Sequence, residues 1–233
     1  MTDGPARPTL LLVHGAWHGA WCWDKLASAL RAEGHRVRTV GLPSAGGRTG
    51  LREDARTIRT ALTHVDGPVV LVGHSYGGIP ASEAAAGAGN VSHLVYLTAY
   101  QLDVGESLLG FHGVPTPPDG EAVTRSVPEN PVAMFYGDVE PGEAEEAAKR
   151  LVPQSTKSFR DTLTEAGWHT VPSTYIVCEN DRALPPETQE RLAVRSGAVH
   201  RLASGHSPFF SHPAELAAVL TEISPGVRRS GST

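Results

Sequence analysis

The chain has 233 residues, of which 40% are hydrophobic and 19% charged, so we predict one α/β domain with a substantial core over residues 1–233. Its net charge of −5, and the lack of any basic cluster before Arg228 and Arg229, argue against a nucleic-acid partner. The apolar run from Leu10 to Val13 is too short for a signal peptide or a membrane span, so we expect a cytoplasmic protein without a membrane partner.

The first part of the chain alternates apolar runs with helical patterns. Thr9–His14 is a continuous apolar run, which is typical of a buried parallel strand. Apolar residues then recur at helical spacing and stop at a glycine, which predicts a helix over 24–34. The more polar run 35–40 predicts an edge strand, and a second helix is expected over 51–64.

The strongest functional signal lies in Val69–Gly78, VVLVGHSYGG. An apolar strand ends at a short turn, and an alanine-rich helix follows it. The pattern G-x-S-x-G in the turn is weak evidence by itself, but the strand before it and the helix after it indicate a nucleophile elbow. Gly73 and Gly77 are expected where a Cβ atom would collide as the strand and the helix pack closely. Ser75 is then exposed at the N-terminus of the helix, so we predict that it is the nucleophile.

The remaining regular elements continue the alternation of strands and helices. Strands are predicted over 91–100, from Thr174, and over 198–204, and helices over 186–195 and 213–223. Strands that alternate with helices indicate a parallel sheet covered on both faces. We therefore predict an α/β fold with a six-stranded, mostly parallel sheet.

A long segment between the fourth and fifth strands, residues 101–171, breaks this alternation. It contains two helical patterns, over 140–151 and 155–167. Because a structureless loop of this length is improbable in a compact domain, we interpret it as a helical insertion that forms a lid. Its aromatic residues either line a substrate pocket or pin the lid to the core. These residues are Phe111, Phe135, Tyr136 and Trp168.

A serine nucleophile needs a base, and the base needs an orienting carboxylate. His206 falls on the loop after the sixth strand, at the edge where open parallel sheets assemble their sites. Asp181 follows the fifth strand, and the order Ser75, Asp181, His206 matches this layout. Glu179 is a possible substitute for the acid. Asp103, after the fourth strand, is the more serious rival.

The oxyanion of such a reaction needs two backbone donors. One is expected from Tyr76, the residue after the nucleophile, and the second from the loop after the first strand, where Ala16 is the best candidate. Gly15 allows the backbone of that loop to approach substrate. Trp17 either lines the pocket or anchors the loop.

The cysteines and histidines give no sign of a metal site. Cys22 and Cys178 are too few for a disulfide framework and are expected to be buried thiols. His14 and His18 lie in a glycine-rich loop without a partnering carboxylate. We therefore expect neither a metal nor a cofactor.

The chain contains the motifs HGAWHGAW, GHSYGG, ENDRALP and GHSPF. These motifs give it a resemblance to the α/β-hydrolases, and more narrowly to the branch of plant methyl-ester esterases, plant hydroxynitrile lyases and bacterial esterase relatives. The likeness runs over nearly the whole chain and implies a six-stranded core without the family's first two strands, no cofactor and a Ser/His/Asp mechanism.

Two positions depart from the lyases of that branch. Those lyases resemble this chain but have a threonine in place of Gly15 and a lysine in place of Ser207, directly after the catalytic histidine. The expected activity is therefore hydrolysis of a carboxylic ester of a small, moderately apolar molecule. A carbon–carbon lyase, a triad-retaining receptor and a biosynthetic thioesterase or cyclase remain as alternatives. A homodimer is among the possible oligomeric states.

Overall fold

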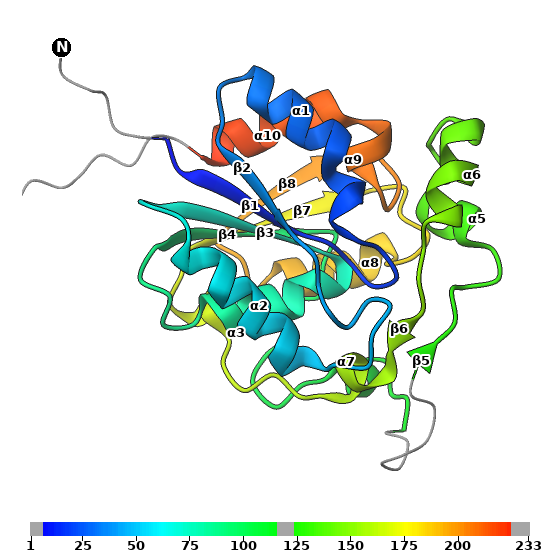
Figure 1. Ribbon diagram of the computed structural model, residues 1–233, viewed down its shortest axis with the longest axis horizontal. Coiled ribbons are helices and arrows are strands. Elements are labelled where there is room, and N and C mark those ends of the chain that lie inside the picture. Colours follow the sequence, from blue (N-terminus) through cyan, green and yellow to red (C-terminus); the bar gives the residue numbers. More distant parts are fainter. Residues whose placement is uncertain (1–6, 116–123, 225–233) are drawn as a thin grey trace, which may run out of the picture.

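A computed structural model describes residues 7–115 and 124–224 and contains one six-stranded sheet, as predicted (Figure 1). Its strand order is β2-β1-β3-β4-β7-β8, and every neighbouring pair is parallel. The polar strand β2 lies at one edge, as expected. The strands are β1 (Thr9–Val13), β2 (Val37–Val40), β3 (Val69–His74), β4 (Val91–Leu97), β7 (Ser173–Cys178) and β8 (Ala198–Leu202).

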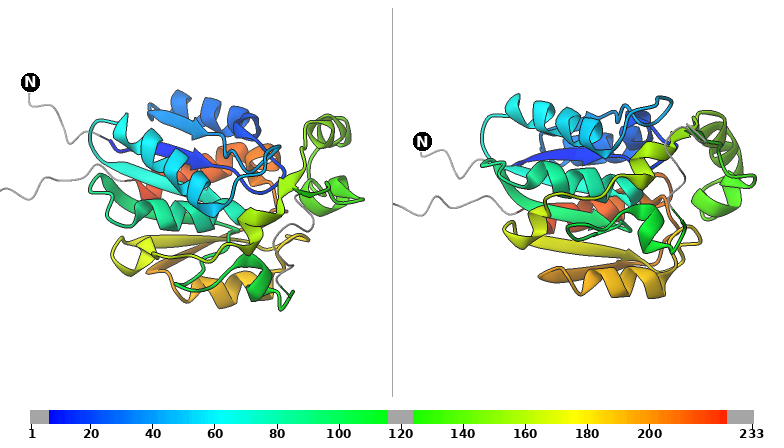
Figure 2. Two further views of the ribbon diagram at one scale, coloured as in Figure 1. Left: turned by 60° about the horizontal axis from the view of Figure 1, so that its bottom comes forward. Right: turned by 90° about the horizontal axis from the view of Figure 1, so that it is seen from below.

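The sheet is buried on both faces because its central strands are predominantly apolar, with side chains that alternate between two core clusters. In β1, Leu11 and Val13 belong to one core cluster, whereas Leu10 and Leu12 belong to the other. Figures 1 and 2 show the helices on either side of the sheet. The first cluster includes side chains of α2 (Leu51–Thr63), α3 (Gly78–Ala85) and α8 (Pro186–Ala193), and the second those of α1 (Asp24–Ala32) and α10 (Pro213–Ile223).

Three short helices lie close to the C-terminal ends of the strands. They are η1 (Ala20–Trp23), η2 (Ser75–Gly77) and α9 (Pro208–Ser211). In the part of the chain that the structure describes, we find no helix with the length and apolar character needed to span a membrane.

The segment between β4 and β7, hereafter the insertion (residues 101–171), carries several short elements. Residues 131–149, in green, project beyond the C-terminal ends of the strands (Figure 2), whereas Gly167 packs against Ser82 and Ala85 of α3. Residues 116–123 of the insertion fall outside the described residues, as do Arg228 and Arg229. The elements are α4 (Leu108–Phe111), β5 (Thr124–Arg125), α5 (Pro131–Phe135), α6 (Pro141–Lys149), β6 (Gln154–Ser155), α7 (Thr156–Arg160) and η3 (Gly167–His169).

The prediction of a helix over 155–167 is wrong for most of its length, because α7 ends at Arg160. Asp161 adopts an extended conformation, with φ −60° and ψ 136°. Its Oδ2 accepts hydrogen bonds from the Leu51 amide, at 3.1 Å, and from Lys157 Nζ, at 2.6 Å. The Asp161 carboxylate therefore accepts from a free amide in the first turn of α2, and α7 ends directly before this residue.

Candidate active site

Ser75 is the first residue of η2, in the tight turn between β3 and α3, and has a backbone φ of 51°, in the left-handed region. A Cβ atom on Gly73 would lie 2.7 Å from Gly78 Cα, and one on Gly77 would lie 2.4 Å from the carbonyl oxygen of His14. Both distances are too short for a real contact, so only glycine fits at these positions. The sequence argument for the two glycines therefore holds in the structure.

A cavity of about 260 Å³ opens beside Ser75, and its lining comes from the sheet edge and from the insertion. Ser75 and His206 both line it. The other lining residues are Ala16, Trp17, Tyr76, Tyr100, Leu108, Leu109, His112, Val114, Arg125, Met134, Phe135, Phe159, Ala183 and Leu184. This predominantly apolar cavity is of a size suited to a small molecule.

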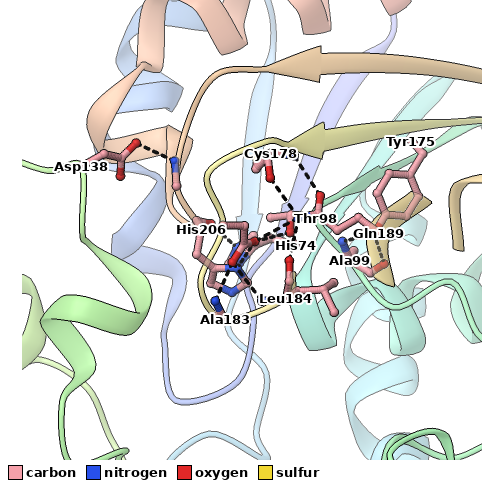
Figure 3. A network of polar contacts seen from close by, with 12 residues as sticks. His74, Thr98, Ala99, Asp138, Tyr175, Cys178, Ala183, Leu184, Gln189 and His206 are labelled. Atoms are coloured by element: carbon pink, nitrogen blue, oxygen red, sulfur yellow. Dashed lines mark hydrogen bonds and ion pairs between the residues drawn. The ribbon is translucent and has the colours of Figure 1, made fainter. Parts of the chain in front are cut away.

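The imidazole of His206 is bonded to Asp181, and both side chains are buried. His206 Nδ1 lies 2.7 Å from Asp181 Oδ2, which also accepts from Thr98 Oγ1. Asp181 Oδ1 accepts from the amides of Ala183, at 2.7 Å, and Leu184, at 2.9 Å (Figure 3). The carboxylate therefore fixes the orientation of the ring and leaves Nε2 as the other ring nitrogen.

Asp181 is held in its charged form despite its burial. Burial raises the pKa of this carboxyl, but the charge of His206 and the hydrogen bonds from His206 and Thr98 lower it by more. The pKa of Asp181 consequently lies below its ordinary value. An ionised carboxylate at this place would stabilise a protonated His206 during a proton transfer.

The loop that carries His206 is bonded on two sides. His74 Nε2 donates to the carbonyl oxygen of His206 at 2.9 Å. Asp138, from the insertion, accepts from the Gly205 amide at 2.6 Å and from Ser211 Oγ at 2.9 Å. Figure 3 shows Asp138 and His74 on different sides of His206. The position of the imidazole therefore depends on both the elbow and the insertion.

The two rival carboxylates lie elsewhere. Asp103 is half-exposed and pairs with His169, whose Nε2 lies 3.0 Å from Asp103 Oδ1. Glu179 is exposed to solvent. A turn after β7 explains the difference: the Asp181 amide donates to the carbonyl of Cys178, and the amides of Ala183 and Leu184 hold the Asp181 carboxylate at the sheet edge.

The loop after β1 holds its peptide units rigidly beside the cavity. His14 Nδ1 donates to the carbonyl oxygen of Gly15 and His18 Nδ1 to that of Ala16, both at 2.8 Å. Trp17 has a φ of 62°. Ala16 and Tyr76, the two residues predicted to donate to an oxyanion, both line the cavity. Their backbones are therefore close to the place where an acyl group would bind.

Backbone strain is concentrated at this edge of the sheet. Among the described residues, three that are not glycine have a positive φ, namely Trp17, Ser75 and Thr98. Trp17 and Ser75 line the cavity, and Thr98 donates to Asp181. Strained residues persist only where their surroundings hold them, and they cluster at functional sites. This clustering supports the cavity as the site of chemistry.

The predicted pocket residues divide into two groups. Trp17 and Phe135 line the cavity, with their ring centroids 5.8 Å apart. The other four predictions require correction, because these residues do not contribute to the cavity lining. They are Gly15, Phe111, Tyr136 and Trp168.

Each of these four residues has another role in the structure. Gly15 packs under the elbow, where a Cβ atom would lie 2.9 Å from Ser75 Cβ. Phe111 packs on Tyr100, and the Tyr136 hydroxyl lies 2.8 Å from His18 Nε2. Trp168 Nε1 donates to the carbonyl of Leu102 at 2.9 Å. Phe111 and Tyr136 thus anchor the insertion to the rest of the fold, and Trp168 joins the two ends of the insertion.

Sequence reasoning missed most of the insertion side of the cavity. Leu108, Leu109 and His112 reach it from α4 and the residue that follows, and Arg125 reaches it from β5. Apolar residues in helices of one turn carry no periodic signal, so the sequence could not identify which side chains face inward. Cys22 and Cys178 are buried free thiols, as predicted.

We expect the protein to lose stability between pH 7 and pH 5. Burial lowers the pKa of His14 to about 4 and that of His18 to about 3, and it lowers the pKa of His74 well below the ordinary value. In the unfolded chain these histidines bind protons near pH 6.5, whereas in the folded chain they stay neutral. Each of the three therefore lowers the free energy of unfolding by about 2 kcal/mol between pH 7 and pH 5. Burial raises the pKa of Asp54 to about 6. Its protonation in the folded state offsets about 1 kcal/mol of that loss.

Urea unfolding at the two pH values measures this loss, for which we expect about 5 kcal/mol in total. His14→Gln keeps a donor for Gly15 and an acceptor for Leu42, and it should reduce the pH dependence by about 2 kcal/mol. His64→Gln, at an exposed position, is the matched control and should leave the pH dependence unchanged. Equal free energies of unfolding at pH 7 and pH 5 would contradict this account.

The chain is similar to known proteins over most of its length. Residues 10–219 match the family model described as alpha/beta hydrolase family. The chain is 32% identical over 234 residues to the alpha/beta hydrolase nvfD of Aspergillus novofumigatus, covering 89% of this chain and 92% of that protein. It is 32% identical over 248 residues to methylesterase 9 of Arabidopsis thaliana, covering 91% and 96%.

A solved structure is similar over almost the same length. The methylesterase MES16 from Arabidopsis has a TM-score of 0.79 and 27% identity, covering 93% of this chain and 98% of that chain. The resemblance to the methyl-ester esterase branch is thereby confirmed, and these relatives support an esterase activity.

Proposed function

Because the chain belongs to the alpha/beta hydrolase family, we propose that it is a serine esterase that hydrolyses a small, moderately apolar carboxylic ester. One observation carries the proposal. The strained Ser75 lines the same cavity as His206, and His206 is bonded through Nδ1 to the buried carboxylate of Asp181. This is the arrangement of nucleophile, base and orienting acid that acyl transfer needs.

The proposed reaction has two halves. His206 Nε2 takes the proton of the Ser75 hydroxyl as Ser75 Oγ attacks the acyl carbon, and the amides of Ala16 and Tyr76 stabilise the oxyanion. Collapse of the tetrahedral intermediate breaks the ester C–O bond, and His206 gives its proton to the departing alcohol. Water then attacks the acyl-enzyme with His206 again as the base. The products are the carboxylic acid, the alcohol and free Ser75.

The lining of the cavity supports a small apolar substrate. Five apolar lining residues come from the insertion, which we propose acts as the lid: Leu108, Leu109, Met134, Phe135 and Phe159. Two of the similar proteins from Arabidopsis are methylesterases by name. We therefore propose a methyl ester as the preferred substrate.

Two positions favour hydrolysis over carbon–carbon cleavage. Gly15 has no room for a side chain, because its Cβ would lie 2.9 Å from both Ser75 Cβ and His74 Nδ1. Ser207, directly after His206, is neutral and fully buried. The hydroxynitrile lyases that this chain resembles have a threonine in place of Gly15 and a lysine in place of Ser207, and this chain has neither.

Rapid mixing with a nitrophenyl acetate ester tests this proposal. We expect a burst of nitrophenolate equal to the enzyme concentration, followed by slower turnover, because acylation of Ser75 precedes its hydrolysis. Mass spectrometry of the acid-quenched protein should place an acetyl group on the peptide containing Ser75. A cyanohydrin should release no cyanide above the rate with heat-denatured enzyme. Cyanide release without any ester turnover would reject the esterase in favour of a lyase.

A further inference from the structure

The buried side chain of Gln154 joins the insertion to the loop after β1. Gln154 begins β6 and is 1% exposed. Its Oε1 accepts from the Trp17 amide at 3.1 Å, and its Nε2 donates to Ser44 Oγ at 2.8 Å. Because a glutamine amide accepts at one end and donates at the other, these partners permit only one orientation of the side chain. Gln154 therefore offers the Trp17 N–H a fixed acceptor.

The same chain of hydrogen bonds continues to the residue after the nucleophile. Ser44 Oγ donates to Asp54 Oδ2 at 2.5 Å, and the Tyr76 hydroxyl donates to that same oxygen at 2.7 Å. Ser44, Asp54 and Tyr76 are all buried. A continuous polar path through Gln154, Ser44 and Asp54 thus connects Trp17 with Tyr76.

Trp17 depends on the insertion for its conformation. Its φ of 62° is unfavourable for a bulky side chain. Besides the amide bonded to Gln154, its carbonyl oxygen accepts from the Val152 amide at 2.9 Å, and its indole Nε1 donates to the carbonyl of Ser126 at 3.0 Å. All three polar groups of Trp17 are therefore bonded to the insertion. The loop after β1 contributes the residue, and the insertion holds it in place.

We propose that Gln154 is a positioning residue for the oxyanion donors. By holding the Trp17 amide it fixes the peptide unit between Ala16 and Trp17, whose carbonyl is already bonded to His18. Together with Ser44 and Asp54, it sets the spacing between the Ala16 and Tyr76 amides. This inference rests on the proposed esterase function. Donors that stabilise a developing charge must be held in place before the reaction. A more mobile loop should therefore reduce the stabilisation of the transition state more than the binding of the substrate.

Gln154→Met tests the proposal because it keeps the length of the side chain and removes both polar ends. We expect kcat for a nitrophenyl ester to decrease about 10²-fold, as when one oxyanion donor is lost, while KM changes by less than about threefold. Ser155→Ala is the matched control, since the Ser155 hydroxyl is buried next to Gln154 and has no hydrogen-bond partner among the described residues. It should retain wild-type kcat.

Hydrogen exchange of the Trp17 amide gives a second measurement that needs no substrate. Gln154→Met should accelerate this exchange about tenfold and leave the amides of β3 protected, and Ser155→Ala should change neither. If the wild type hydrolyses no ester, the proposed function is wrong, and the exchange rates still decide whether Gln154 holds the loop. Should Gln154→Met fail to fold, Ser44→Ala breaks the path between Gln154 and Asp54 while Ser158 Oγ still accepts from Gln154 Nε2 at 2.8 Å, so it should give a smaller loss of kcat in the same direction.

Three results would overturn the positioning role. The first is an unchanged kcat in a folded Gln154→Met variant. The second is Trp17 exchange equal to that of the wild type. The third is an increase in KM that accounts for the whole loss of kcat/KM, since this would mark Gln154 as a residue that shapes substrate binding and not the transition state.

Discussion

Ser75→Ala is expected to lower kcat for a methyl or nitrophenyl ester by about 10⁵-fold or more, on the pattern of serine deletions in other triads. The variant keeps the cavity, the amides of Ala16 and Tyr76 and the His206–Asp181 pair, but no atom remains to form the acyl-enzyme. The measurements are the steady-state rate and the burst amplitude, and the burst should vanish.

The fold of this variant should be unaffected. Alanine meets the same steric cost as serine at a φ of 51°, so the free energy of unfolding should stay within about 1 kcal/mol of the wild type. A Ser75→Ala protein that still gave a full burst would show that another residue is acylated, and the assignment of the nucleophile would then be wrong.

Asp181→Asn should lower kcat by about 10⁴-fold with little change in KM. The asparagine amide can present its NH₂ group to His206 Nδ1 and favour the tautomer with the proton on Nε2, so that His206 no longer accepts the proton of Ser75. The thermal midpoint of the variant should be recorded alongside its kinetics, because Ala183 and Leu184 also donate to Asp181.

Asp103→Asn is the matched control for this variant. Asp103 also follows a strand of the sheet, but it is half-exposed and pairs with His169 instead of His206. The control should retain kcat within about threefold of the wild type. Full activity of Asp181→Asn, together with a large loss in Asp103→Asn, would reverse the assignment of the acid.

The sheet and the residues at its edge could be predicted from the sequence because strong local patterns place them. Apolar strands and glycine-bounded turns predicted where β3 ends, so Ser75 followed directly. Asp181 and His206 follow two other strands of the same parallel sheet, whose C-terminal ends lie at one edge. Topology thus brought together residues that are far apart in the sequence.

The insertion could not be predicted to the same depth, for physical reasons. Its helices are short, so a shift of one residue in the predicted helix changes which side chain faces the cavity. His112 lines the cavity, whereas its neighbour Phe111 does not. Gln154 and Asp138 are single polar residues in irregular segments, with no periodicity to mark them. Their roles depend on hydrogen bonds to loops more than 60 residues away in the chain.

The insertion is bonded to both loops of the candidate site, through Gln154 and Val152 to Trp17 and through Asp138 to Gly205. This attachment limits how the substrate range can be altered by recombination with related proteins. A chimera that replaces residues 101–171 wholesale would also remove the supports of both loops of the candidate site. Mutant libraries should instead vary apolar residues that line the cavity, such as Leu108, Leu109 and Met134, and keep the bonded positions constant.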